Sequence, residues 1–234
     1  MFIVSKDPKS IAAENYRILR TNIQYSSFDN EIRKILVTSS EPGEGKSTTA
    51  GNLALTFAQD GKKTIIIDCD LRKPTMHKKF NISNTVGLSD VMLDYKNINK
   101  AIHNVDKNLY VLPAGKIPPN PSEMLGSKAL DSLLDELAKI YDVIVIDSPP
   151  LLAVTDAQIL SKKVDGAVLV VRSNFTKKDT VLAAKEVLVK VKANILGTVL
   201  TRADEKKHGY YYYYGNWYGG MNLWLISIHT SYLE

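Results

Sequence analysis

Short runs of consecutive apolar residues recur along the chain with few polar interruptions. The runs are rich in Val and Ile, a pattern typical of parallel strands that are buried on both faces. Between the runs, apolar residues repeat at helical spacing, as at Ala50, Leu53, Ala54 and Phe57. We therefore expect amphipathic helices between strands at residues 35–38, 64–68, 109–113, 141–147, 166–171 and 195–200.

This alternation of strands and helices predicts the architecture of the chain. We expect an α/β fold, a three-layer sandwich with a mostly parallel central sheet, whose ligand site lies at the carboxyl ends of the strands. The length of 234 residues suits one large domain followed by a tail. We place the domain at residues 1–205, with a leading helix at 10–24, and a flexible C-terminal tail at 206–234.

A glycine-rich segment at residues 39–48 follows the first predicted strand and precedes a predicted helix. Such a loop curls so that backbone N–H groups and the helix N-terminus face the phosphates of a nucleotide. Lys46 is suited to reach the β- and γ-phosphates, and the Ser47 hydroxyl is suited to bind Mg²⁺. Ser40 stands where the first glycine of this motif is usual. The pattern predicts a P-loop NTPase fold that holds a nucleotide through Glu41, Gly43, Glu44, Gly45, Lys46, Ser47 and Thr48.

Acidic residues stand at the ends of two predicted strands. Asp68 ends one strand and is followed by Asp70, and Asp147 ends another. Because these strand ends lie near the phosphate loop, we expect Asp147 and Asp68 to bind Mg²⁺ together with Ser47. Asp68 is also the candidate general base for an incoming hydroxyl. The alternative is that these carboxylates cap helices or form turns.

Arg72 follows the second strand closely. It has two interpretations that the sequence leaves evenly balanced: it neutralises charge on a transferred phosphate, or it pairs with Asp70. We include Arg72 and Asp70 with Lys46 and Asp68 in the candidate catalytic set.

Charge and cysteine content limit the partners and the cell compartment that we expect for the protein. The formal net charge is +5, but the lysines are scattered among acids, so we expect no nucleic-acid partner. The sequence has one cysteine, Cys69, which excludes a disulfide framework and favours a reducing cytosol. No signal peptide is evident at the start, and the apolar run at 223–226 is far shorter than a membrane span. We therefore expect a cytoplasmic protein that reaches a membrane only through a partner.

Together these motifs resemble the bacterial tyrosine kinases of capsule and exopolysaccharide synthesis. Residues 40–47, 65–72 and 144–150 match the three nucleotide motifs of that family. In the leading helix, one face carries residues that resemble the family's ring-forming motif, and a tyrosine run near the end resembles its autophosphorylation cluster. These residues are Glu14, Arg17 and Arg20 in the helix, and Tyr210, Tyr211, Tyr212, Tyr213 and Tyr214 in the run. The resemblance extends over residues 10–215.

The resemblance implies an ATP-dependent protein-tyrosine kinase that uses Mg²⁺ and phosphorylates its own tyrosine cluster in trans, within a ring-shaped homo-oligomer. It implies a role in regulating capsular or extracellular polysaccharide synthesis and export. The implied partners are the cytoplasmic tail of a transmembrane polysaccharide chain-length regulator, which activates the kinase at the inner face of the membrane, together with protein-tyrosine substrates and a cognate phosphatase. Arg202 stands where related ATPases often place an asparagine for adenine, so it is the candidate stacking partner of the base.

Several alternatives stay open at this level. Residues 216–234 suit a docking strand, a foreign end or a disordered tail. The Glu14 helix face also suits ordinary solvated surface, and the tyrosine run suits an aromatic edge strand. A non-kinase switch ATPase of the partitioning or septum-placement type shares the predicted fold, although Glu41 stands where such ATPases usually carry a second lysine. A metabolic P-loop enzyme with a small substrate has no motif to support it.

Overall fold

The computed structural model describes residues 2–27, 31–203 and 224–228, the last of these by their backbone alone. Helices and strands alternate along most of this length, as the apolar pattern predicts. In chain order the elements are α1 (Ile3–Lys6), α2 (Ile11–Gln24), β1 (Lys34–Ser39), α3 (Lys46–Gln59), β2 (Thr64–Asp68), α4 (Met76–Phe80), α5 (Leu88–Leu93), the 3₁₀ helix η1 (Tyr95–Asn97), α6 (Ile98–Ala101), β3 (His103–Asp106), β4 (Leu109–Leu112), α7 (Pro121–Gly126), α8 (Lys128–Ile140), β5 (Val143–Asp147), α9 (Asp156–Ser161), β6 (Gly166–Arg172), α10 (Lys178–Lys190), β7 (Ile195–Thr201) and β8 (Trp224–Ile228).

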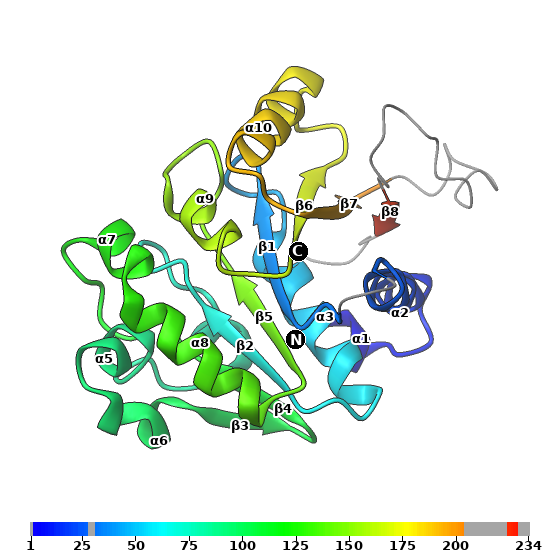
Figure 1. The fold of residues 1–234 in the computed structure, drawn as a ribbon. Coiled ribbons are helices and arrows are strands. Elements are labelled where there is room, and N and C mark those ends of the chain that lie inside the picture. Colours follow the sequence, from blue (N-terminus) through cyan, green and yellow to red (C-terminus); the bar gives the residue numbers. More distant parts are fainter. Residues whose placement is uncertain (1, 28–30, 204–223, 229–234) are drawn as a thin grey trace.

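One sheet of eight strands runs through the molecule in the order β3-β4-β2-β5-β1-β6-β7-β8 (Figure 1). Every neighbouring pair is parallel except β3 and β4. β1 lies between β5 and β6, and in the β2–β5 pair Asp68 lies directly opposite Asp147. The α/β class and the mostly parallel sheet are therefore confirmed.

Helices cover both faces of the sheet because successive side chains of each strand point to opposite faces. On one face, Ile35 and Val145 join a core built with α2 and α3. On the other face, Leu36 and Ile144 join a core built with α5 and α8, while α9 and α10 cover β6 and β7. Figure 1 shows these two helical layers with the sheet between them. The three-layer prediction is confirmed.

Three details of the fold differ from the prediction. β3 is a short edge strand in which half-buried and exposed residues alternate, so it lacks the continuous apolar run that marks the other strands. β5 begins at Val143 rather than at residue 141, because the Tyr141 N–H still bonds to the Leu137 carbonyl at the end of α8. Residues 224–228, which we assigned to a flexible tail, form β8 and pair in parallel with β7.

The tyrosine cluster at 210–214 lies outside the described residues. Within the part of the chain that the structure describes, no helix is both long enough and apolar enough to cross a membrane.

Candidate functional site

The phosphate loop connects β1 to α3 and depends on two glycines with left-handed backbone conformation. Gly43 has φ +83° and Gly45 has φ +97°, values that side-chain-bearing residues rarely adopt. A Cβ atom on Gly45 would also lie 3.3 Å from the Thr201 side chain. No side chain caps the start of α3. The N–H groups of its first turn are therefore available to an anion.

Glu44 stabilises the phosphate loop through hydrogen bonds of its side chain and its carbonyl group. Its carboxylate is buried and accepts hydrogen bonds from the Glu41 N–H at 2.7 Å and from the Thr176 hydroxyl. The Thr201 hydroxyl donates to the Glu44 carbonyl at 2.7 Å. The loop is thus tied to the segment that follows β6 and to the last residue of β7. Because the Glu44 side chain is used inside the protein, only its backbone is suited to contact a nucleotide.

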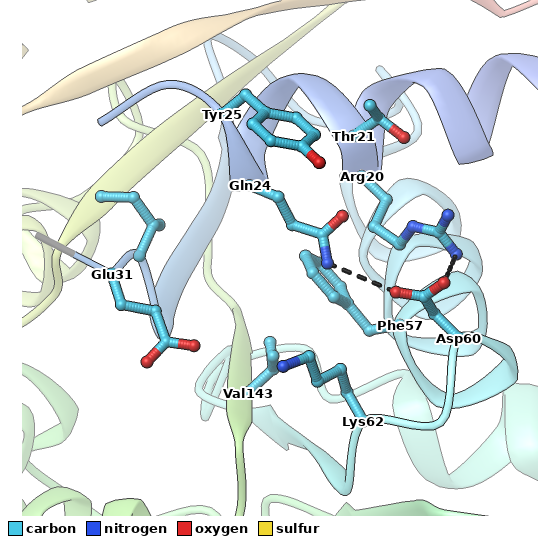
Figure 2. A pocket seen from close by; sticks show the side chains of 10 residues that line it. Arg20, Thr21, Gln24, Tyr25, Glu31, Phe57, Asp60, Lys62 and Val143 are labelled. Atoms are coloured by element: carbon cyan, nitrogen blue, oxygen red, sulfur yellow. Dashed lines mark hydrogen bonds and ion pairs between the residues drawn. The ribbon is translucent and has the colours of Figure 1, made fainter. Parts of the chain in front are cut away.

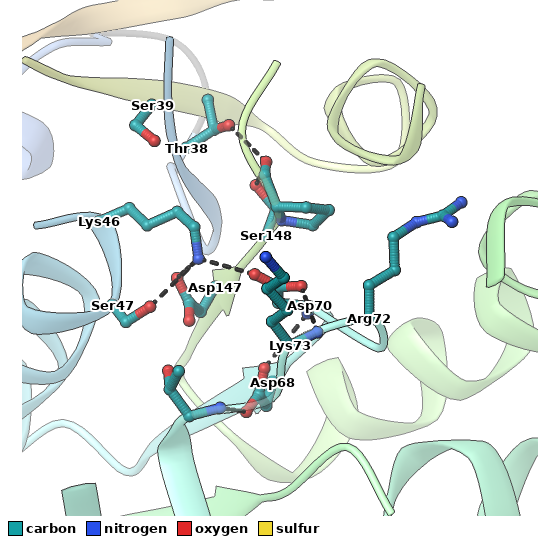
Figure 3. Close-up of polar contacts among 12 residues, drawn as sticks. Thr38, Ser39, Lys46, Ser47, Asp68, Asp70, Arg72, Lys73, Asp147 and Ser148 are labelled. Carbon is teal, nitrogen blue, oxygen red and sulfur yellow. Dashed lines mark hydrogen bonds and ion pairs between the residues drawn. The ribbon is translucent and has the colours of Figure 1, made fainter. Parts of the chain in front are cut away.

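Three aspartates, Asp68, Asp70 and Asp147, form an acidic cluster around the end of the Lys46 side chain (Figure 3). Its Nζ atom donates to Asp70 Oδ2 at 2.9 Å and to Ser47 Oγ at 3.2 Å, and it lies 3.8 Å from Asp147 Oδ1. Burial alone would lower the pKa of Lys46, but the charges of Asp147 and Asp70 outweigh it and raise the pKa. Lys46 is therefore a buried cation held next to the first turn of α3.

Asp147 ends β5 and is fully buried. Neither of its carboxylate oxygens has a hydrogen-bond partner among the described residues. Burial raises the pKa of this carboxyl group above its ordinary value. A buried carboxylate without donors is costly, and a divalent cation would satisfy it.

The Ser47 hydroxyl lies beside the same cluster as Asp147 (Figure 3). Among the described residues, no group of three or more His, Cys, Asp or Glu side chains is arranged to hold a metal alone. Asp147 and the Ser47 hydroxyl suit Mg²⁺, which typically takes one or two protein ligands together with phosphate oxygens and water. The residues therefore fit the ion.

Asp68 ends β2 beside Asp147 and is also fully buried. Its Oδ2 atom accepts from the N–H groups of Thr75 and Met76, both at 2.9 Å, and its Oδ1 atom accepts from the Asp70 N–H at 3.2 Å. Burial, followed by the charge of Asp147, raises the pKa of Asp68 to about 7. Asp68 thus holds the start of α4 through hydrogen bonds, and its raised pKa also suits a general acid or base.

Arg72 lies apart from this cluster. Its Nε atom donates to Asp156 Oδ2 at 2.9 Å, and its Nη2 atom donates to Asp156 Oδ1 at 3.1 Å and to Ser122 Oγ at 2.9 Å. Figure 3 shows the side chain pointing away from Lys46. The expected alternative, a pair with Asp70, is therefore corrected: Arg72 pairs with the buried Asp156, a residue that our sequence analysis did not single out.

The three residues of α2 that resemble a ring-forming motif take part in two different sets of contacts. Arg17 donates to Glu14 at 2.7 Å and to the Pro8 carbonyl, at an exposed position. Arg20 instead reaches the end of α3, where it donates to the Thr56 carbonyl at 3.0 Å and lies 3.2 Å from Asp60. The charge of Arg20 is thus engaged with α3, whereas the half-buried Arg17 pairs with the exposed Glu14 on α2 itself.

A pocket of about 420 Å³ lies beside Arg20, between the ends of α2 and α3 (Figure 2). Gln24 and Arg20 both reach Asp60 across one side of it, and Tyr25 lies at its margin. None of its lining residues belongs to the phosphate loop or to the acidic cluster. This pocket is therefore separate from the nucleotide site.

Arg202 follows β7 and is exposed, with a left-handed φ of +53°. It lies one residue beyond Thr201, whose hydroxyl contacts the phosphate loop. Its position at the carboxyl edge of the sheet is compatible with the expected adenine contact, which stays a prediction.

The fold and the cluster define a class of protein. A glycine loop between a buried strand and a helix, a lysine in that helix and acids at neighbouring strand ends define a P-loop nucleotide-binding protein. The sequence model of the AAA domain matches residues 31–181. A plasmid partition protein from Borrelia burgdorferi has the same fold, with a TM-score of 0.62 at 22% identity.

More similar proteins specify the family. The chain is 47% identical to the tyrosine-protein kinase YwqD of Bacillus subtilis, over 91% of this chain and 90% of that protein. It is 42% identical to the putative tyrosine-protein kinase CapB of Staphylococcus aureus, over 91% and 94% of the two chains. The kinase domain of the Escherichia coli tyrosine kinase ETK superposes with a TM-score of 0.83 at 32% identity, over 92% of this chain and 85% of that one. The chain belongs to the bacterial tyrosine kinase family and is a protein-tyrosine kinase.

Proposed function

We propose that this kinase transfers the γ-phosphoryl group of ATP, bound with Mg²⁺, to the tyrosines at 210–214 of a neighbouring copy. The observation that carries this proposal is the arrangement around Asp147. The buried Asp147 carboxylate, whose oxygens have no hydrogen-bond partner among the described residues, the Lys46 ammonium 3.8 Å from it and the Asp68 carboxylate meet at one edge of the sheet, beside a helix N-terminus open to phosphate. This is the set of charges that phosphoryl transfer requires.

Two of the three residues expected at the metal would hold it directly, and the third, Asp68, would lie beside it as the base. Asp147 and the Ser47 hydroxyl would bind Mg²⁺, which would neutralise charge on the β- and γ-phosphates. Lys46 donates to Asp70 Oδ2 at 2.9 Å. This contact directs the Lys46 ammonium into the cluster, where it would also bind a phosphate oxygen of ATP.

Asp68 would act as the base. The Tyr O–H proton would pass to Asp68, the phenolic oxygen would bond to the γ-phosphorus, and the bond from that phosphorus to the β,γ-bridging oxygen would break to release ADP. Asp68 Oδ1 is the suitable atom, because Oδ2 already accepts two N–H groups. A pKa of about 7 lets the group accept a proton at neutral pH and release it afterwards.

Transfer would occur between subunits. The eight residue-to-residue steps from Asp204 to Tyr212 span at most about 27 Å when fully extended, which is a short length for doubling back into the same subunit's site. Glu14 and Arg17 present charges on the exposed face of α2 that would pair with an adjacent copy in a ring.

Family membership supports the rest of the proposal. The chain would regulate capsular or extracellular polysaccharide synthesis and export, and it would be activated by the cytoplasmic tail of a transmembrane chain-length regulator. That partner would bring a cytoplasmic protein to the inner face of the membrane. Other tyrosine-bearing proteins and a cognate phosphatase complete the expected set of partners.

The direct test is phosphotyrosine formation. Purified protein incubated with Mg·ATP and the activator's cytoplasmic segment should gain phosphotyrosine that an antibody detects. A Lys46→Met variant should keep its circular dichroism spectrum but lose transfer by at least about 100-fold, because it removes a charge at the γ-phosphate without emptying the core. Normal phosphotyrosine in the folded variant would overturn the assignment. ATP-dependent dimerisation without any phosphotyrosine would instead favour the switch ATPase.

A further inference from the structure

A second lysine contacts the phosphate-loop helix from α4. The Lys79 Nζ atom donates to the Thr48 hydroxyl oxygen at 2.9 Å. Thr48 lies in the first turn of α3, immediately after Lys46 and Ser47. Lys79 is half-buried, unlike its exposed neighbour Lys78. This contact joins segments 31 residues apart in the sequence, so no local sequence motif marks Lys79.

α4 is fixed in place at both ends, which makes Lys79 more than a loose surface lysine. At its start, the Thr75 and Met76 N–H groups donate to the buried Asp68 carboxylate. At its end, the Phe80 ring packs on the Phe2 ring, with 4.7 Å between the ring centroids. The Lys79 ammonium is therefore held beside α3 by a helix that is itself anchored to the acidic cluster.

The surroundings of Lys79 place it in the electrostatic field of the nucleotide site. Burial lowers the pKa of Lys79, while the charge of Asp147 raises it and the charge of Lys46 lowers it. Both charged neighbours belong to the cluster described above. Lys79 is therefore within electrostatic reach of the cluster, and Thr48 is its direct contact with the phosphate-loop helix.

The direction of the hydrogen bond has a chemical consequence for Thr48. Its oxygen accepts from an ammonium group, so its own hydrogen must point elsewhere. The Thr48 hydroxyl belongs to the same first turn of α3 as the N–H groups that no side chain caps. We propose that Lys79 is a positioning residue for ATP, which fixes the Thr48 hydroxyl as a charge-assisted donor to a phosphate. This inference rests on the proposed use of ATP but not on the identity of the phosphate acceptor.

Nucleotide affinity tests the proposal directly. We expect Lys79→Met in the full-length chain to weaken Mg·ATP binding in calorimetric titration by about tenfold, the usual effect of losing one charge-assisted hydrogen bond. The rate at saturating ATP should change much less than the Michaelis constant for ATP. Lys78→Met, on the exposed side of the same helix, is the matched control and should leave the affinity within about twofold.

A double-mutant cycle then asks whether Lys79 acts through Thr48. Thr48→Val should also weaken binding, and adding Lys79→Met to it should have no further effect. Thr48→Ser keeps the hydroxyl and should keep the full effect of Lys79→Met. If Lys79→Met lowers the melting temperature, Lys79→Arg, which keeps the charge, should restore most of the affinity.

Three results would overturn the inference. They are unchanged ATP affinity in folded Lys79→Met, an equal loss of affinity in the Thr48→Val background, and failure of Lys79→Arg to restore binding. Because binding is measured without phosphotransfer, tight ATP binding that responds to Lys79 would stand even if no tyrosine were phosphorylated. The two proposals therefore fail separately.

Discussion

Two buried aspartates in this molecule have opposite surroundings. Asp147 and Asp156 are both fully buried. Asp156 accepts from Arg72 and from the Ser122 hydroxyl, whereas neither oxygen of Asp147 has a hydrogen-bond partner among the described residues. The carboxylate of Asp156 stabilises the loops around it. The buried carboxylate of Asp147, which lacks hydrogen bonds, lowers the free energy of unfolding. A bound cation would stabilise it.

This contrast gives a prediction at the level of single residues. At a pH above its ordinary pKa, the Asp147 carboxyl group is charged in the unfolded chain. Folding buries the group and raises its pKa, so the charged form destabilises the folded state. Asp147→Asn should therefore raise the melting temperature of the nucleotide-free protein at pH 7 by about 2–4 °C. Asp156→Asn should lower it, because Arg72 loses its charged partner.

Scanning calorimetry measures both variants under the same conditions. Asp147→Asn should also reduce phosphotransfer by at least about 100-fold and remove most of its dependence on Mg²⁺ concentration. A melting temperature for Asp147→Asn that falls as far as that of Asp156→Asn would show that Asp147 is a structural acid instead.

The residues of the cluster could be identified from the sequence because each follows a strong local signal. Lys46 and Ser47 lie in a glycine-rich loop, and Asp68 and Asp147 end continuous apolar strands. The partner of Arg72 could not be identified in this way, because Asp156 lies 84 residues away. The contact between Lys79 and Thr48 was hidden for the same reason. Contacts between distant segments depend on how loops pack, which no local pattern records.

At the scale of elements, the phosphate loop depends on its backbone shape. Gly45 and Gly61 both have left-handed φ values, +97° and +86°. A Cβ atom on Gly45 would meet Thr201 at 3.3 Å, whereas one on Gly61 would meet nothing within 4 Å. Substituting Gly61 measures the free-energy cost of a left-handed backbone alone. Substituting Gly45 measures that cost together with the effect on the phosphate loop.

We expect Gly45→Ala and Gly61→Ala to destabilise the fold by about 1 kcal/mol each, with a somewhat larger loss for Gly45→Ala because of the close approach to Thr201. Only Gly45→Ala should weaken ATP binding, since it displaces the N–H groups that face the phosphates. Chemical denaturation and nucleotide titration measure the two quantities. Equal ATP affinity in the two variants would contradict the assigned role of the loop.

Elements with a continuous or periodic apolar pattern were predictable, and elements without one were not. The central strands and α8 have continuous or strictly periodic apolar residues, so their positions follow from the sequence. β3 has only four residues, and α4 has five. α4 forms where Asp68 accepts the N–H groups at its start. Its existence depends on a tertiary contact more than on a helical pattern.

At the scale of the whole molecule, α2 provides a test of assembly. Glu14 and Arg17 form an exposed pair three residues apart, and Glu136 and Lys139 form a similar exposed pair on α8. If α2 holds a ring, replacing Glu14 and Arg17 with alanine should reduce the particle mass in light scattering without changing the circular dichroism. The same replacement at Glu136 and Lys139 should leave the mass unchanged. Arg20 is kept, because it contacts Thr56 and Asp60 within the chain.

An equal mass for both double variants and the unmodified protein would identify the α2 pair as ordinary solvated surface. A loss of mass in both variants would show that general surface charge, and not this helix face, controls assembly.

Phosphorylation itself should alter the assembly. Each phosphotyrosine adds roughly −1.5 to −2 charges at neutral pH. Several on neighbouring residues would repel one another and would be expelled from a site that contains Asp68, Asp70 and Asp147. We therefore expect the tails to leave the neighbouring sites and the ring to loosen as phosphate accumulates.

The most direct test of the account mixes two variants of the chain. One carries Lys46→Met and intact tyrosines, and the other is active but has phenylalanine at all five positions of 210–214. With Mg·ATP and the activator's cytoplasmic segment, phosphate should appear on the inactive chain, and the oligomer should shrink as it does. Mass spectrometry of the separated chains and light scattering report the two results. An unlabelled inactive chain would contradict transfer in trans, and labelling without a change in mass would contradict the coupling of phosphorylation to assembly.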